Sequence, residues 1–164
     1  MNSILPDDNY VYHGSHELFD LVVPKKQIRI NKEGEEIFNQ ISFHATPYRW
    51  IALAYTFQRM SSENNQQNRG YKMGVDLYDH LPRIIVYGYE SLEKSLAAMY
   101  GSGGYVYVFE KNDFSHMDGL GNLEVITKQS IKPFRVDRIE DPVAEVKSEG
   151  IEFIFVDQDQ DLTA

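Results

Sequence analysis

Short runs of apolar and alternating residues recur along the chain and predict an α+β fold. Most are the length of a strand, and YVYVFE at 105–110 is the most regular of them. Strands and helices do not alternate regularly enough for a doubly wound parallel sheet, so mostly antiparallel strands are expected. The expected strands are residues 9–13, 21–23, 40–45, 83–88, 105–110, 122–127, 131–136 and 151–156.

Helices are expected where apolar residues recur every three or four positions. The first is expected to begin at Thr46 as N-cap, with Pro47 at the first helical position, and to continue to about Met60. Its Tyr48, Ile51, Ala52 and Tyr55 would then share one face. Two more helices are expected, at 90–100 and 141–149, the former ending at the glycines of 101–104.

Two polar segments are expected to lie outside the regular elements. Residues 25–38 (KKQIRINKEGEEIF) are interpreted as an exposed excursion with a weak helical turn near 33–38. Residues 61–70 (SSENNQQNRG) are interpreted as a hydrophilic loop, a candidate lid or target-recognition segment.

Length and composition predict one domain, spanning 1–164, with a real core. The chain has 164 residues, of which 42% are hydrophobic. Its longest apolar runs are strand-sized, whereas a membrane span needs roughly 20 residues, so no membrane partner is expected. The first residues lack a basic region followed by an apolar core, so no secretory signal is expected. With no cysteine, a cytoplasmic location is expected.

The charge is strongly acidic, at −9 from 25 acidic and 16 basic residues. This balance opposes nonspecific binding to a nucleic-acid backbone, which needs clustered Lys and Arg, but it allows a small phosphate-bearing ligand. Acidic residues concentrate in 137–161, which is interpreted as a solvated face; a docking surface for a basic partner is the alternative.

Common catalytic and metal motifs are absent from the sequence. The five histidines are scattered without metal-ligand spacing, so no metal is expected. There is no Walker loop, GxGxxG or GxSxG motif.

Three separated segments do carry candidate chemistry. The first is His13-Gly14-Ser15, at the end of the first strand. The second, residues 41–57 (ISFHATPYRWIALAYTF), is a strand leading into an aromatic-rich helix. The third, residues 121–136, places Glu124 in a strand that is followed by a turn and another strand.

In order and spacing these segments resemble the ADP-ribosyltransferase family, in its His-Tyr-Glu branch of diphtheria-toxin-like and poly(ADP-ribose)-polymerase-like domains. The matching pieces are YHGS at 12–15, SFHAT at 42–46 with Ala52 and Tyr55, and EVITKQSIKP at 124–133. The resemblance implies a split, mostly antiparallel β-sheet core over 10–136. An acidic helix and strand would follow in 137–164.

The resemblance also implies that NAD is a substrate and that Glu124 is catalytic. Glu124 would accept a hydrogen bond from the 2-hydroxyl of the nicotinamide ribose and stabilise an oxocarbenium-like transition state. The backbone of Gly14 would bind the nicotinamide amide, because no side chain blocks its approach. His13 would hold a ribose hydroxyl of the adenosine half, and Ser15 would add a hydrogen bond near the nicotinamide.

An aromatic pair would stack on the nicotinamide ring. Phe43 stands where the branch has its first tyrosine, and Tyr48 and Tyr55 compete for the second position. Asn122, two residues before Glu124, stands where relatives often carry a Glu or Gln that presents the acceptor. The acceptor, whether protein or nucleic acid, stays open.

Two alternatives of other classes remain. One is a non-catalytic interaction or immunity protein with a decayed site, and the other is a module that binds NAD or ADP-ribose without turnover. The environment of Glu124 separates the interaction protein from the enzyme, since a Glu124 that points into bulk solvent would contradict catalysis. The binding module predicts the same cleft as the enzyme, with saturable binding but no release of nicotinamide.

Overall fold

A computed structural model of the chain describes residues 5–58, 70–77, 81–116 and 123–161. It confirms an α+β arrangement of mostly antiparallel strands in three three-stranded sheets. In the described residues, no helix has the length and apolar character that crossing a membrane requires. The expected loop at 61–70 lies almost wholly outside the described residues.

The first sheet has the order β1-β6-β8 and separates two hydrophobic clusters. It joins β1 (Tyr10–Ser15), β6 (Gly104–Glu110) and β8 (Arg135–Ile139), all antiparallel. Val106 and Val108 of β6 belong to one cluster, while Tyr107 and Phe109 belong to the other. Because both faces are covered, β6 is apolar at nearly every position.

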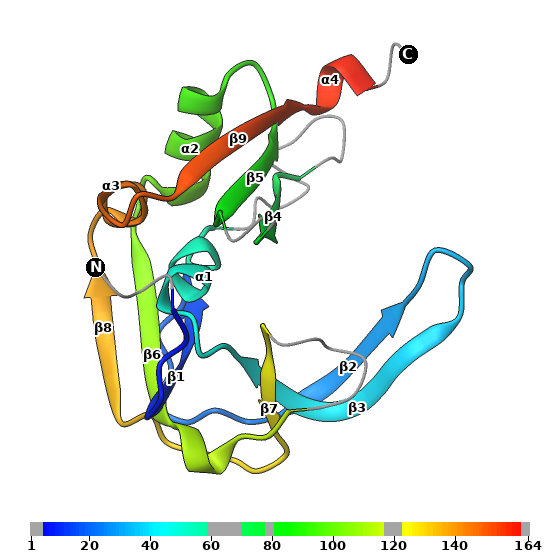
Figure 1. Cartoon of the computed structure of the whole chain (residues 1–164), viewed down its shortest axis with the longest axis vertical. Coiled ribbons are helices and arrows are strands. Elements are labelled where there is room, and N and C mark those ends of the chain that lie inside the picture. Colours follow the sequence, from blue (N-terminus) through cyan, green and yellow to red (C-terminus); the bar gives the residue numbers. More distant parts are fainter. Residues whose placement is uncertain (1–4, 59–69, 78–80, 117–122, 162–164) are drawn as a thin grey trace.

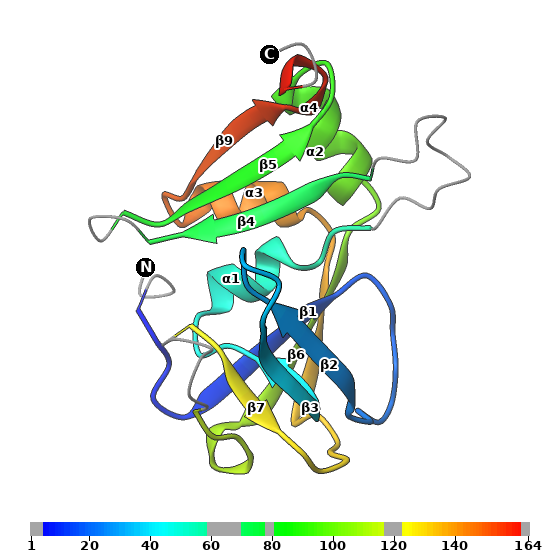
Figure 2. The ribbon, with the colours of Figure 1, turned by 90° about the vertical axis from the view of Figure 1, so that its right-hand side faces the viewer.

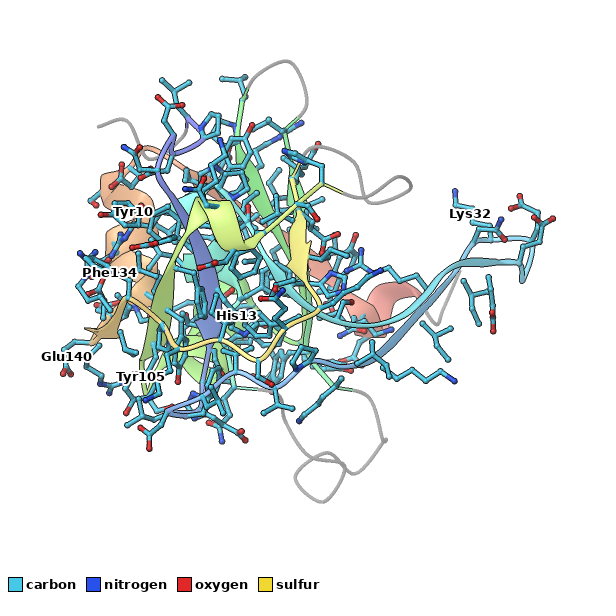
Figure 3. The ribbon with its side chains drawn as sticks, turned by 90° about the horizontal axis from the view of Figure 1, so that it is seen from below. Tyr10, His13, Lys32, Tyr105, Phe134 and Glu140 are labelled. Atoms are coloured by element: carbon cyan, nitrogen blue, oxygen red, sulfur yellow. The ribbon has the colours of Figure 1, made fainter. Side chains whose placement is uncertain are left out.

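The second sheet, β2-β3-β7, extends away from the rest of the fold. Strands β2 (Lys25–Ile30) and β3 (Glu36–Ala45) form an antiparallel hairpin, and the inner end of β3 pairs with β7 (Val125–Thr127). Figures 1 and 3 show this hairpin reaching out from the body, with Lys32 at its tip.

The third sheet, β4-β5-β9, covers the opposite side of the molecule. Strand β5 (Arg83–Gly88) pairs antiparallel with β4 (Lys72–Asp76) and parallel with β9 (Glu152–Asp157). Helix α1 (Arg49–Ala54) lies between this sheet and the other two (Figure 2). Residues 50–54 are at most 3% exposed, as expected of a helix that is apolar on all sides.

The remaining helices border the β4-β5-β9 sheet or connect strands. Helix α2 (Leu92–Tyr100) is capped by the Ser91 side chain, and α3 (Pro142–Ser148) by Asp141. A 3₁₀ turn follows β6 at Lys111–Asp113, and α4 (Gln158–Asp161) follows β9. Gly101 is the C-cap of α2, which confirms the helix stop expected there.

The prediction for residues 25–38 was wrong, because they form most of a β-hairpin. Ile28 and Ile30 alternate with polar residues, as in a strand whose two faces are both open to water. The connection is a turn in which Asn31 Oδ1 accepts from the backbone N–H groups of Glu33 and Glu35, with Gly34 at φ +83°.

Helix α1 is shorter than expected, beginning at Arg49 and ending at Ala54. The hydroxyl of Thr46 accepts from Tyr48 N in the turn before the helix, instead of capping it. At the other end, Thr56 bonds to the Leu53 carbonyl, and Gln58 N donates to Met99 O. The chain therefore leaves the helical path well before Met60.

Three strand predictions also differ from the structure. The strand expected at 122–127 is formed only over Val125–Thr127, so Glu124 lies just outside it. Residues 21–23 make only a bridge, between Val22 and Ile131. Strand β8 begins at Arg135, after Pro133, whose nitrogen cannot donate to a ladder. Strand β4 was not expected at all.

Candidate functional site

His13, Gly14 and Ser15 are the last three residues of strand β1, and all three pair with β6. Tyr12 exchanges both backbone hydrogen bonds with Thr46, at 2.7 and 2.8 Å, on the side away from β6. Hydrogen-bonding direction repeats every second residue in an antiparallel ladder, so the N–H and C=O of Gly14 also point away from β6.

Gly14 also lies against helix α1. A Cβ at this position would collide with the carbonyl oxygen of Ala52 and crowd Thr56 N. The glycine is therefore required by the fold itself, independently of any ligand. The same contact brings the C-terminal end of α1, with Tyr55, next to Gly14.

The His13 ring is neutral and has a defined tautomer. Its Nδ1 lies 2.8 Å from the carbonyl oxygen of His44, which can only accept, so the proton is on Nδ1. Burial lowers the pKa of His13 from 6.5 to about 4, which outweighs the opposite effect of that hydrogen bond. At neutral pH its Nε2 is therefore an acceptor, suited to a hydroxyl donor.

Aromatic rings surround His13. The Phe43 ring lies 4.4 Å from it, and Phe19 and Tyr107 lie 6.3 and 6.2 Å away. Phe19 and Tyr107 stack on each other at 4.1 Å, and the Tyr107 hydroxyl donates to Glu17 O while accepting from Phe19 N. We call His13, Gly14 and the Phe43 ring the His13 half of the site; Figure 3 labels His13.

Glu124 directly precedes β7, and its carboxylate is half-buried, at 24% exposure. Both oxygens accept from Arg29 of β2 at 2.7 Å, and Nδ1 of His44 lies 3.7 Å from Oε1. Burial raises the pKa of Glu124, but His44 and Arg29 outweigh it and lower the pKa from 4.5 to about 2. Arg29, His44 and Glu124 form the Glu124 half.

His44 contacts both halves. Its backbone carbonyl binds His13, while its imidazole faces Glu124. Residues 43 and 44 point to opposite faces of β3, so Phe43 lies on the His13 side and the His44 ring on the Glu124 side. Glu124 thus does not point into bulk solvent.

The predicted aromatic residues are placed differently from one another. Phe43 packs on His13 and on Phe109, at 5.6 Å, and so is part of the interior. Tyr48 is the N-cap of α1 and packs against the core. Tyr55 is the C-cap of α1 and is 44% exposed; it contributes electrostatically to the raised pKa of Arg29, after the larger effect of Glu124.

The other predicted site residues add little. The Ser15 hydroxyl accepts from Glu17 N at 3.0 Å and still has a proton to donate. Asn122 lies outside the described residues. In the described part of the chain, no three His, Asp or Glu side chains gather in a way that could hold a metal ion.

Sequence reasoning missed Arg29 and gave His44 no role. Arg29 is 95 positions from Glu124, and its segment was interpreted as an irregular excursion. The alternation of Ile28 and Ile30 with polar residues was the signal that could have indicated a strand. No comparable signal marked His44.

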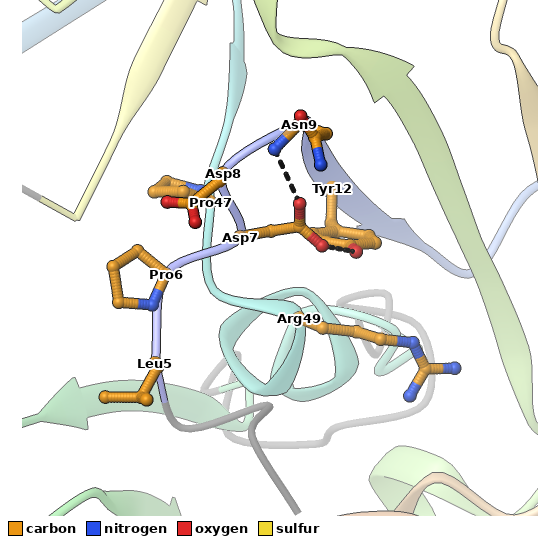
Figure 4. Close-up of a pocket in the computed structure, with 8 residues that line it drawn as sticks. All are labelled: Leu5, Pro6, Asp7, Asp8, Asn9, Tyr12, Pro47 and Arg49. Carbon is orange, nitrogen blue, oxygen red and sulfur yellow. Dashed lines mark hydrogen bonds between the residues drawn. The ribbon is translucent and has the colours of Figure 1, made fainter.

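Two cavities lie away from the predicted site residues. One, of about 460 Å³, is next to the start of β1, where the Asp7 carboxylate accepts from the Tyr12 hydroxyl at 2.7 Å and from Asn9 N at 2.8 Å (Figure 4). The other, of about 680 Å³, lies between α2 and α3. Neither is lined by His13, Gly14 or Glu124.

Comparisons of the chain with protein-family models, curated proteins and solved structures gave no match.

Proposed function

We propose that the chain binds NAD and transfers its ADP-ribose group to an acceptor, as an ADP-ribosyltransferase-like enzyme. The observation that carries the proposal is the pairing of an ionised, half-buried Glu124 with a neutral His13, both held by contacts to one residue, His44. The reaction needs an anionic carboxylate at the position of Glu124 and, at the position of His13, a nitrogen that accepts a hydrogen bond from a ribose hydroxyl.

In the reaction, the bond between the nicotinamide nitrogen and ribose C1′ breaks, and its electron pair leaves with nicotinamide. Positive charge develops on the ribose, and the Glu124 carboxylate stabilises it while accepting a hydrogen bond from the 2-hydroxyl. The acceptor then forms a bond to C1′ and loses a proton. A carboxylate has about four lone-pair positions, so the two bonds from Arg29 leave capacity for the ribose hydroxyl.

The other residues would bind the two ends of NAD. The backbone N–H and C=O of Gly14, which point away from β6, would hold the nicotinamide amide. Nε2 of His13 would accept a hydrogen bond from a ribose hydroxyl of the adenosine half. Of the three aromatic candidates, Tyr55 has the exposure that stacking on a ligand requires, whereas Phe43 is occupied by its contact with His13.

A second candidate is a module that binds NAD or ADP-ribose without turnover. The bidentate contact of Arg29 with Glu124 favours it, because that contact engages both carboxylate oxygens. The two candidates predict the same binding site but differ in the release of nicotinamide.

The test is nicotinamide release from NAD, measured beside calorimetric NAD binding for the native protein and for Glu124→Gln. An enzyme predicts release by the native protein and at least about a hundredfold slower release by the variant, with binding retained. The matched control is Glu152→Gln, which changes an exposed carboxylate on β9 and should leave both readouts unchanged.

The outcomes separate the candidates. If both proteins bind NAD and neither releases nicotinamide, with a range of protein and nucleic-acid acceptors supplied, the binding module is supported. If neither binds NAD or ADP-ribose, both candidates fail, and a search for a partner protein is the next step.

A further inference from the structure

The His44 side chain has a polar neighbour on each of two sides within the Glu124 half, one at hydrogen-bond distance and one at ion-pair distance. Its Nδ1 lies 3.7 Å from Glu124 Oε1, and its Nε2 lies 3.1 Å from the Ser42 hydroxyl. Ser42 and His44 are two residues apart on β3, so their side chains share a face of the strand. Each ring nitrogen therefore faces one defined polar group.

Ser42 serves to orient this imidazole. It is 1% exposed, so no substrate can reach its hydroxyl and it cannot act as a nucleophile. When the hydroxyl donates to Nε2, the imidazole proton is on Nδ1, the nitrogen that faces the carboxylate. In that tautomer the order hydroxyl, imidazole, carboxylate directs an N–H toward Glu124.

Arg29 and His44 hold Glu124 in different ways. The Arg29 side chain is 44% exposed and comes from the projecting hairpin, whereas the His44 side chain is 16% exposed and belongs to the inner end of β3. Water or an anionic ligand can replace the carboxylate at an exposed guanidinium at little cost. The His44 contact cannot be exchanged in this way without moving β3.

We propose that His44 is a positioning residue for the ADP-ribosyl transfer reaction: through its carbonyl it sets His13, and through its imidazole it aims the Glu124 carboxylate at the ribose. The inference rests on the proposed function. In this account His44 stays beside Glu124 when a ligand binds, whereas the contact between Arg29 and Glu124 is the one that a bound ligand displaces.

The test compares His44→Phe with the native protein in two measurements. One is the pKa of the Glu124 carboxyl, followed by carbon-detected NMR without any ligand. The other is kcat and KM for nicotinamide release. The variant keeps the carbonyl that binds His13 and removes both ring nitrogens, so the pKa of Glu124 should rise by about one unit and kcat should fall about tenfold, with KM for NAD changed less than about twofold.

Two further variants make the result specific. His44→Gln restores an amide donor and should recover part of both effects. His116→Phe makes the same side-chain change at an exposed histidine and should change neither.

The outcomes separate failure of this inference from failure of the proposed function. An unchanged pKa of Glu124 in a folded His44→Phe protein overturns the inference, whatever happens to the rate. If the pKa rises but the native protein releases no nicotinamide, the transfer reaction is rejected, and His44 stands only as the residue that orients Glu124.

Discussion

The His13 half and the Glu124 half of the site are held by different forces. His13 is neutral, and rings and backbone paired in the core surround it. Glu124 is charged, half-exposed and bound to an arginine that comes from a projecting hairpin. The comparison teaches that the His13 half is part of the folded core, whereas in the Glu124 half the contact with Arg29 can be replaced by water or by an anionic ligand. Substitutions, pH and salt should therefore affect the two halves unequally.

The largest effect is expected at Gly14. Gly14→Ala forces a Cβ into the Ala52 carbonyl, between β1 and the buried helix α1, and should lower the free energy of unfolding by about 3 kcal/mol. Urea unfolding measures it. The control is Gly34→Ala in the exposed hairpin turn, where a Cβ meets open space and only the positive φ is strained, at about 1 kcal/mol. Equal losses for both variants would contradict the close packing of Gly14.

A pH titration of stability should distinguish the halves next. The folded-state pKa of His13 is lowered from 6.5 to about 4, so the unfolded chain binds more protons between these values. Stability then falls as the pH drops from 6.5 to 4, by roughly 3 kcal/mol at most. The pKa of Glu124 is lowered from 4.5 to about 2, so its contribution is lost only below pH 4.5.

His13→Gln, which keeps a donor for the His44 carbonyl, is the matched variant for that titration. It should flatten the dependence of unfolding free energy on pH between 6.5 and 4 and leave the region below 4 as in the native protein. If native and variant have the same slope above pH 4.5, His13 is not a buried neutral histidine.

A smaller effect is expected from the aromatic wall of the His13 half. Tyr107→Phe removes a hydroxyl that donates to Glu17 O at 2.7 Å and accepts from Phe19 N at 2.8 Å. Two hydrogen bonds are lost, so thermal or urea unfolding should show a loss of about 1–2 kcal/mol. Tyr105→Phe on the same strand is the control and should cost under about 0.5 kcal/mol. If Tyr107→Phe leaves the free energy of unfolding unchanged, stacking alone holds Phe19 in place.

The smallest effect on stability is expected at Arg29. Its partner is half-buried but Arg29 is 44% exposed, so Arg29→Gln should cost about 0.5–1 kcal/mol at low salt. Near 1 M NaCl the difference in unfolding free energy between Arg29→Gln and the native protein should largely disappear, because the Debye length falls to about 3 Å. Arg135→Gln, whose guanidinium is 55% exposed beside Asp137, is the comparison and should cost less. A loss that salt does not change would show that Arg29 is as fixed as the His13 half.

Local signals in the sequence predicted those parts of the fold whose residues agree with their surroundings. Strands β5, β6 and β9 and helices α2 and α3 are apolar or well capped, and they lie close to where the pattern indicated them. The inner part of β3 was predicted as a strand, but β2 was missed because its only two apolar residues, Ile28 and Ile30, are both exposed. Helix α1 was overextended, because the contact of Gln58 with Met99 that ends its path is invisible in a local pattern.

The sequence by itself placed His13 and Gly14 at the end of a strand and Glu124 within one residue of a later strand, because strand alternation and short motifs are local properties. Only the tertiary structure decided what those residues touch. Arg29 and Glu124 are 95 positions apart in the sequence. His44 lies between His13 and Glu124 because the end of β3 pairs with β7, while Thr46, the residue after β3, forms a bridge with Tyr12 of β1. Such contacts depend on how the sheets are assembled, and a chain fixes them through packing and strand register rather than through the identity of neighbouring residues.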